Sequence, residues 1–142
     1  MPTPAVSGDS SSRTYLETPY LGIRWDGQQV IVDMRARASS ADFRAGMETC
    51  HRAIVETQTT RPLLDCRDMR LLLVEDERWL AADFLPLLAT TRLRWMAVVT
   101  PENSLAREIV KDLAKPRPTK TVSNHCATVA EAMLWLSRTV AP

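Results

Sequence analysis

The chain has 142 residues, 45% of them hydrophobic and 25% charged, values typical of one soluble globular domain with a substantial core. Its formal net charge of +1 gives no electrostatic reason to expect nucleic acid or an acidic membrane as a partner. No apolar run approaches the roughly 20 residues that span a bilayer, so we expect no transmembrane segment. Three widely spaced cysteines argue against a disulfide framework and favour a cytoplasmic location.

The first part of the chain divides into a polar segment and a hairpin. Residues 1–18 are rich in Pro, Ser and Thr, so we expect a disordered segment ahead of a single domain over residues 19–142. Nothing in that segment resembles a signal peptide. Tyr20–Trp25 and Val30–Met34 predict two antiparallel strands, and Asp26-Gly27 is typical of a two-residue turn between them.

A first helix is predicted over Ser40–Thr57. Ser39 and Asp42 have the spacing of a capping pair at its start. Apolar residues then recur at helical spacing and give one buried stripe. They are Phe43, Met47, Cys50 and Ile54.

The middle of the chain organises the rest. Leu63–Asp65 follows Pro62 as a short apolar run, typical of a strand that is covered on both faces. A charged loop leads to Glu75–Glu77, where negative charge favours the first turn of a second helix. Pro86 should kink or break that helix. Its inner face would consist of Leu80, Phe84, Leu87 and Leu88.

Four further elements complete the pattern. Trp95–Val99 and Thr119–Val122 predict strands, and Thr100-Pro101 predicts the start of a third helix between them. Thr128 and Glu131 form a capping box for a final helix. The inner faces of these two helices would be Leu105, Ile109 and Leu113, and Val129, Met133, Leu136 and Val140.

The alternation of strands and helices predicts an α/β fold. We expect a mostly parallel five-stranded sheet with right-handed crossovers, a leading antiparallel hairpin strand and four main helices. The predicted strands are apolar at odd and even positions alike, so both faces of the sheet need cover. A second copy of the chain is one way to supply it, and we therefore expect a homodimer.

This order of elements resembles the STAS domains, the family of anti-sigma-factor antagonists and sulphate-transporter tails. It is similar above all to a bacterial branch of small proteins grouped with the lipid-binding CRAL-TRIO domains. The resemblance covers about residues 20 to 140 and implies a β-α superhelix with its strands in chain order. The residues that carry it are the Tyr20–Met34 hairpin, Leu63-Leu64-Asp65 with Arg67 and Met69, Glu75-Asp76 before Trp79-Leu80, Met96–Val99 before Pro101, and Ala132 with Trp135-Leu136.

The loop after Asp65 is where we expect a binding site, because sites in open α/β sheets form beyond the carboxyl ends of the strands. The resemblance implies a phosphorylatable Ser or Thr there, yet Cys66–Glu75 contains no hydroxyl residue. We therefore expect a non-enzymatic regulatory or protein-interaction domain of STAS-like fold without that switch. The candidate surface consists of Asp65, Arg67, Asp68, Arg70, Glu75, Asp76 and Trp79.

The alternative is a carrier for a lipid or another small apolar molecule. Its pocket would lie between the second helix and the sheet. The lining would be Trp79, Phe84 and Leu88.

An enzyme is less favoured on the residues present. Cys66 follows a strand as a nucleophile could, but Asp65 and Asp68 beside it would raise the pKa of its thiol, although Arg67 and Arg70 would oppose them. The sequence has no Gly-rich phosphate loop and no nucleophile elbow.

A metal site is also less favoured. Cys50-His51 and His125-Cys126 lack the ligand spacing of a zinc site. Asp65, Asp68, Glu75 and Asp76 could in principle ligate magnesium, but they suit turn caps and a helix start better. We expect no cofactor.

Overall fold

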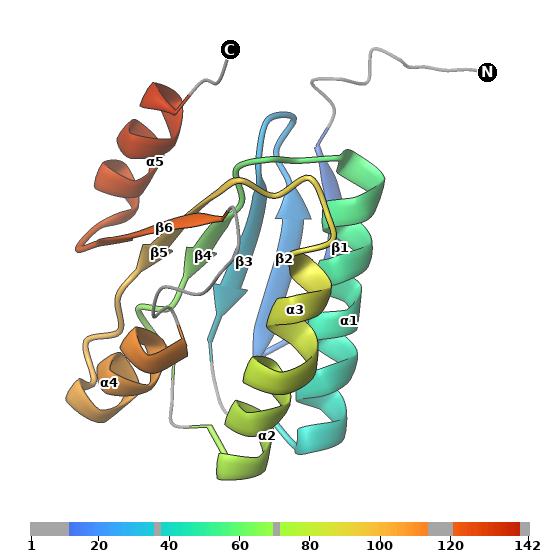
Figure 1. Ribbon diagram of the computed structural model, residues 1–142, viewed down its shortest axis with the longest axis vertical. Helices are drawn as coiled ribbons and strands as arrows, with labels where there is room; N and C mark the ends of the chain where they lie inside the picture. Colours follow the sequence, from blue (N-terminus) through green and yellow to red (C-terminus); the bar gives the residue numbers. More distant parts are fainter. Residues whose placement is uncertain (1–11, 36–37, 70–71, 114–120, 140–142) are drawn as a thin grey trace.

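The computed structural model of the chain describes residues 12–35, 38–69, 72–113 and 121–139. A six-stranded mixed sheet forms its centre, and the strands lie side by side in chain order (Figure 1). The first three strands pair antiparallel and the remaining ones pair parallel, which confirms the α/β class. The strands are β1 Arg13–Glu17, β2 Leu21–Trp25, β3 Val30–Met34, β4 Leu63–Asp65, β5 Trp95–Val99 and β6 Val122–Cys126.

Strand β1 was not predicted, because residues 1–18 were assigned to a disordered segment. Its pairing with β2 contains an irregularity between Thr14 and Leu16. Tyr15 and Leu16 consequently both pack against the core, and the Tyr15 hydroxyl donates to Glu56 at 3.0 Å. This irregularity removes the apolar alternation by which a strand is recognised. Residues 1–11 lie outside the described part of the chain.

The turn between β2 and β3 is longer than predicted. It spans Asp26 to Gln29, and the Asp26 carboxylate accepts from the N–H groups of Gln28 at 2.8 Å and Gln29 at 2.7 Å. Gly27 has a φ of 97°, which a side chain would disfavour. A side-chain turn built on Asp26 therefore replaces the two-residue turn expected from Asp26-Gly27.

Helix α1, Ser40–Thr57, has the predicted bounds, and Ser39 caps it by accepting from the N–H of Asp42. The second helix is divided into α2 Val74–Trp79, a π-helical segment η2 Leu80–Phe84, and α3 Leu85–Leu88. Leu85, just before Pro86, donates its N–H to the carbonyl of Leu80, five residues earlier. The helix thus widens before Pro86, where a kink or break was predicted.

Helix α4, Ser104–Leu113, begins later than predicted, because Asn103 rather than Thr100 caps it, with its Oδ1 accepting from the N–H of Ala106. Thr100 instead donates its N–H to Cys126 at 3.0 Å and continues the pairing of β5 with β6. The last strand ends at Cys126 and not at Val122, while residues 119 and 120 lie outside the described chain. Helix α5, Val129–Arg138, starts at the predicted cap Thr128.

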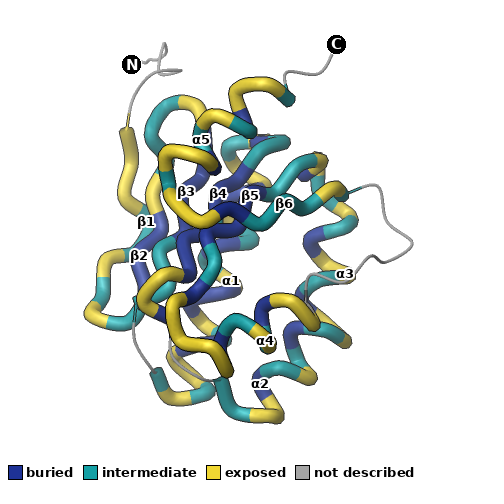
Figure 2. Tube along the Cα trace, turned by 90° about the vertical axis from the view of Figure 1, so that its left-hand side faces the viewer, coloured by how far each residue is buried: buried dark blue, intermediate teal, exposed yellow. Residues whose placement is uncertain are grey.

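The helices form two unequal layers on the sheet. One face packs against α1, η2 with α3, and α4, whereas α5 covers β4 to β6 on the other face (Figure 1). Buried residues concentrate on the central strands, and exposed residues on the outer turns of the helices (Figure 2). Beyond α5 the second face carries polar groups such as Arg24 and Asp33 on β2 and β3. The homodimer stays a prediction. This face leaves less apolar surface for a second copy to cover than the apolar strand patterns had indicated.

Candidate functional site

Two neighbouring parallel strands carry aspartates at their carboxyl ends, Asp33 as the penultimate residue of β3 and Asp65 as the last residue of β4. Asp33 of β3 and Asp65 of β4 lie in register with each other. Just beyond them is an open cleft of about 590 Å³, which we call the charged cleft. It lies at the carboxyl ends of the strands, where open α/β sheets place their sites. Its lining consists of Asp33, Arg35, Arg67, Asp68, Met69, Glu102 and Asn103.

Asp65 and Arg67 form the best-defined contact at this edge. The guanidinium binds both carboxylate oxygens, with Nη2 to Oδ2 at 2.8 Å and Nε to Oδ1 at 3.0 Å. Asp65 is buried, whereas 49% of the Arg67 side chain is exposed. The bidentate hydrogen bond from Arg67 to Asp65 raises the pKa of the guanidinium. The pair therefore holds the Arg67 guanidinium in a fixed orientation at the rim of the charged cleft, with its positive charge balanced by Asp65.

A second arginine is held in the same cleft. Arg35 donates from Nε to Asp33 at 3.1 Å and from Nη2 to Glu17 at 3.2 Å. Hydrogen bonding to Arg35 lowers the pKa of the exposed Glu17 carboxyl. Gly22 makes room for this arrangement, because a Cβ atom at that position would lie 2.6 Å from Arg35 Nη2.

Backbone hydrogen bonds fix the loop that carries Arg67. Cys66 donates its N–H to Val99 at 2.9 Å, and Glu102 donates its N–H to Arg67 at 3.4 Å. Within the loop, the N–H of Met69 reaches the carbonyl of Cys66 at 3.0 Å. The loop is thus joined to β5 and to the start of α4.

The candidate surface expected from the sequence divides into two parts. Arg67 and Asp68 line the charged cleft, whereas Asp65 is buried behind Arg67 and does not line it. Arg70 lies outside the described residues. Glu75, Asp76 and Trp79 are on helix α2 and do not line this cleft. Sequence reasoning missed Asp33, Arg35, Glu102 and Asn103. A usable signal was that Val30–Asp33 repeats the pattern of Leu63–Asp65, an apolar run that ends in Asp.

Asp76 proves to be an interior residue rather than part of a surface. It is 2% exposed and accepts from Ser40 Oγ at 3.0 Å and from Arg44 Nε at 3.2 Å. The Arg44 guanidinium also lies 5.3 Å from the ring centre of Trp79, which stacks on Phe84 at 5.5 Å. Asp76 and Trp79 therefore attach helix two, the continuous segment of α2, η2 and α3, to α1.

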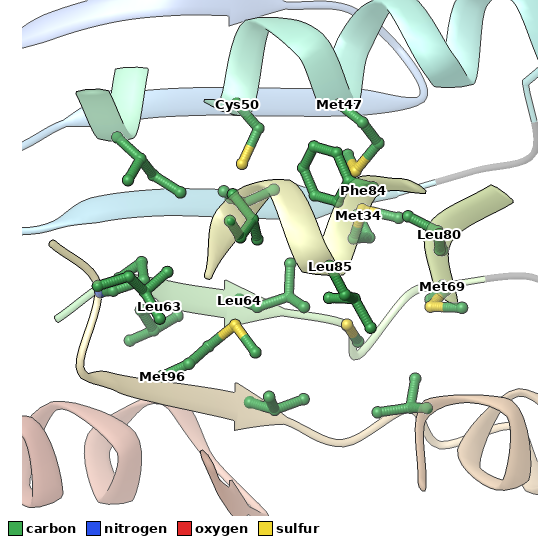
Figure 3. A pocket seen from close by; sticks show the side chains of 18 of the residues that line it. Met34, Met47, Cys50, Leu63, Leu64, Met69, Leu80, Phe84, Leu85 and Met96 are labelled. Atoms are coloured by element: carbon green, nitrogen blue, oxygen red, sulfur yellow. The ribbon is translucent and has the colours of Figure 1, made fainter. Parts of the chain in front are cut away.

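A separate apolar cavity of about 100 Å³ lies between helix two and the sheet (Figure 3). Phe84 and Leu88 line it, in the place the carrier hypothesis expected. Trp79 is not part of the lining and packs against Phe84 from outside the cavity. Of the three residues expected to line the carrier pocket, Phe84 and Leu88 line this cavity and Trp79 does not.

No family model, curated protein or solved structure matches this chain. The charged cleft and the apolar cavity are the two features that bear on function. Within the described ranges, no group of three or more His, Cys, Asp or Glu side chains is placed to hold a metal ion. Among the helices that the structure describes, none is long and apolar enough to cross a membrane.

The cysteines are placed poorly for nucleophilic chemistry. All three are buried, including Cys66 at the end of β4. Burial raises the pKa of the Cys50 thiol to about 12. Burial also raises the pKa of Cys66, and the nearby Asp65 carboxylate raises it further. Their thiolates are consequently scarce at neutral pH.

We expect the native protein to be inert to thiol reagents. Ellman's reagent at about pH 8 should titrate none of the three cysteines within minutes, because the reagent needs an accessible thiolate. In denaturant all three should react at once. Fast modification of Cys66 in the native protein, located by mass spectrometry, would reopen the case for a nucleophile at this edge.

Proposed function

We propose that this chain is a non-enzymatic regulatory or protein-interaction domain of STAS-like fold, with the charged cleft as its contact surface. One observation carries the proposal. Arg67 is half-exposed at a strand end, and a bidentate pair with the buried Asp65 fixes its orientation. An arginine that is already ordered loses little side-chain entropy when a partner binds it, and arginine is enriched in interface hot spots.

The charge pattern of the cleft favours a macromolecular partner with charges of both signs. Arg67 is flanked by Asp68 and Glu102, two exposed carboxylates. Alternating charge of this kind fixes the register of a partner and repels wrong ones. Exposed charges are screened by salt, so the association should weaken as ionic strength rises.

The same residues are less suited to catalysis. The two arginines are occupied by Asp65, Asp33 and Glu17. The two thiols at this end of the sheet, those of Cys66 and Cys126, are buried, and burial raises the pKa of both. These features support binding rather than bond-making at the cleft.

Charge reversal in the cleft tests the proposal. Tagged wild-type protein and Glu102→Lys should be compared by affinity capture from cells, with quantitative mass spectrometry of the captured proteins. Glu102 is exposed, so the variant should fold normally while its interaction partner is lost by roughly tenfold or more.

Glu75→Lys is the matched control, because it makes the same change on an exposed residue of α2 away from the cleft. Its captured proteins should be those of the wild type. Arg67→Ala gives a second reading of the cleft and should also lose the partner. Retention of the same partner by both cleft variants would contradict the proposal.

A second candidate function is the binding of a small apolar molecule, favoured by the cavity between helix two and the sheet. Its volume of about 100 Å³ is well below the roughly 300–1,000 Å³ of sites for drug-sized ligands. It therefore suits a much smaller molecule than a lipid. Native mass spectrometry of the purified protein should show the added mass of a bound molecule if carriage is the function.

A further inference from the structure

We infer that the apolar cavity is a binding site for a compact apolar molecule, and that the loop Cys66–Met69 couples its occupancy to the charged cleft. The ligand class is a small uncharged hydrocarbon or halogenated hydrocarbon, up to about the size of benzene. The inference deepens the proposed function and rests on it for the role of the cleft, whereas the cavity itself is independent of any partner.

Size and lining set the ligand class. The cavity of about 100 Å³ is walled entirely by apolar side chains, so it offers nothing to a charged or strongly polar molecule. An apolar cavity of about 150 Å³ engineered in another protein stays dry and binds benzene or xenon. The present cavity is of the same order and would need only a small expansion to hold a six-membered ring.

The wall is able to expand in this way. Four of the six methionines of the chain line the cavity. They come from three strand or loop segments and from α1 (Figure 3). Unbranched thioether side chains change rotamer at little cost and fit varied shapes. These methionines are Met34, Met47, Met69 and Met96.

The cavity is also not sealed by the sheet and helices. Leu64 and Met96 point into it from β4 and β5, and both are only partly buried although these strands lie inside the sheet (Figure 3). On the opposite wall Leu80 and Phe84 belong to the π-helical segment η2. Such segments occur often at functional sites, and here the widened turn that precedes Pro86 forms one wall of the cavity.

The loop after β4 separates the cavity from the cleft. Cys66 lines the cavity, Arg67 and Asp68 line the charged cleft, and Met69 contributes to both. A molecule that displaces Met69 therefore pushes on the loop that carries Arg67. The four consecutive residues Cys66–Met69 therefore link occupancy of the cavity to the orientation of Arg67 in the cleft.

Methyl-labelled methionine tests ligand binding directly. Benzene is added to the protein carrying ¹³C-methyl methionine, and the methyl resonances are followed by NMR. The resonances of the four lining methionines should shift as benzene is added and reach a plateau at high benzene concentration. Met133 should not, because it packs on the other face of the sheet with α5, and it serves as the internal control.

A cavity-filling variant tests the location. Leu64→Phe places a ring in the cavity and should weaken benzene binding by at least about tenfold. Leu134→Phe makes the same change on an exposed site of α5 and should bind as the wild type does. If Leu64→Phe fails to fold, Cys50→Leu fills the space from α1 with the same expected loss.

Several results would overturn the site: no shift of the lining methionines, an equal shift at Met133, or unchanged affinity in the filled variants. Tighter binding of palmitate than of benzene would overturn the size limit. The coupling predicts that benzene also shifts the backbone amide resonances of Arg67 and Asp68. Unchanged amide resonances at these two residues would contradict the coupling. No partner is needed for these readouts, so loss of the proposed interaction function would leave them unaffected.

Discussion

Leu136→Ala should lower the free energy of unfolding by about 2–5 kcal/mol, as deletion of a fully buried leucine commonly does. Leu136 is 0% exposed and belongs to the cluster of Ile31, Leu63, Ala97 and Val99. Among the described helices, α5 is the one that packs on this face of the sheet. No other helix in the described ranges is placed to move in and fill the space. Urea unfolding followed by circular dichroism measures the loss.

Leu134→Ala is the matched control on the same helix. Its side chain is 52% exposed, so the same substitution should change stability by no more than about 0.5 kcal/mol. Equal losses in the two variants would mean that α5 contributes through helix formation alone and does not pack on the sheet as described.

Arg44→Met should have the next largest effect, with a loss of about 2–4 kcal/mol. The change leaves the carboxylate of Asp76, whose side chain is 3% exposed, without its charged partner. The contact of the guanidinium with Trp79 is lost as well. Asp76→Asn in the Arg44→Met background should recover part of the loss, because it removes the uncompensated charge. Denaturant unfolding of the single and double variants gives the coupling.

Arg52→Met provides the comparison on the same helix. Arg52 pairs with Glu56 at 3.8 Å, and both side chains are largely exposed, so the loss should stay below about 1 kcal/mol. If Arg44→Met costs no more than Arg52→Met, the Asp76 carboxylate must be more accessible to water than the structure indicates.

The elements that sequence patterns predicted well are those with local signals. Leu63–Asp65 was recognised as an interior strand because an apolar run without polar alternation needs cover on both faces, and it does pair with strands on both sides. Helix α1 was predicted to its ends by its cap and its apolar stripe. Strand β1 was missed because an irregular register in its pairing breaks the alternation.

The site was predicted less completely, because its residues meet through tertiary pairing. The rule for strand ends pointed to the loop after Asp65, and Arg67 and Asp68 of that loop line the charged cleft. The register that places Asp33 beside Asp65 joins residues far apart in sequence, so no local pattern could predict it. Asp76 was misplaced for a similar reason. An acidic residue in a first helical turn is usually exposed, whereas here Arg44, 32 residues earlier, draws it into the interior.

The order of the strands has a consequence for synthesis. Each strand adds to the edge made by the strand before it, so a nascent chain can extend its sheet as it leaves the ribosome. Helix α5 is the last described element to emerge. Until then the apolar face under it, including Leu63 and Val99, faces water and offers a surface to chaperones or to aggregation. Ribosomes stalled before Val129 should therefore carry chains that chaperones retain.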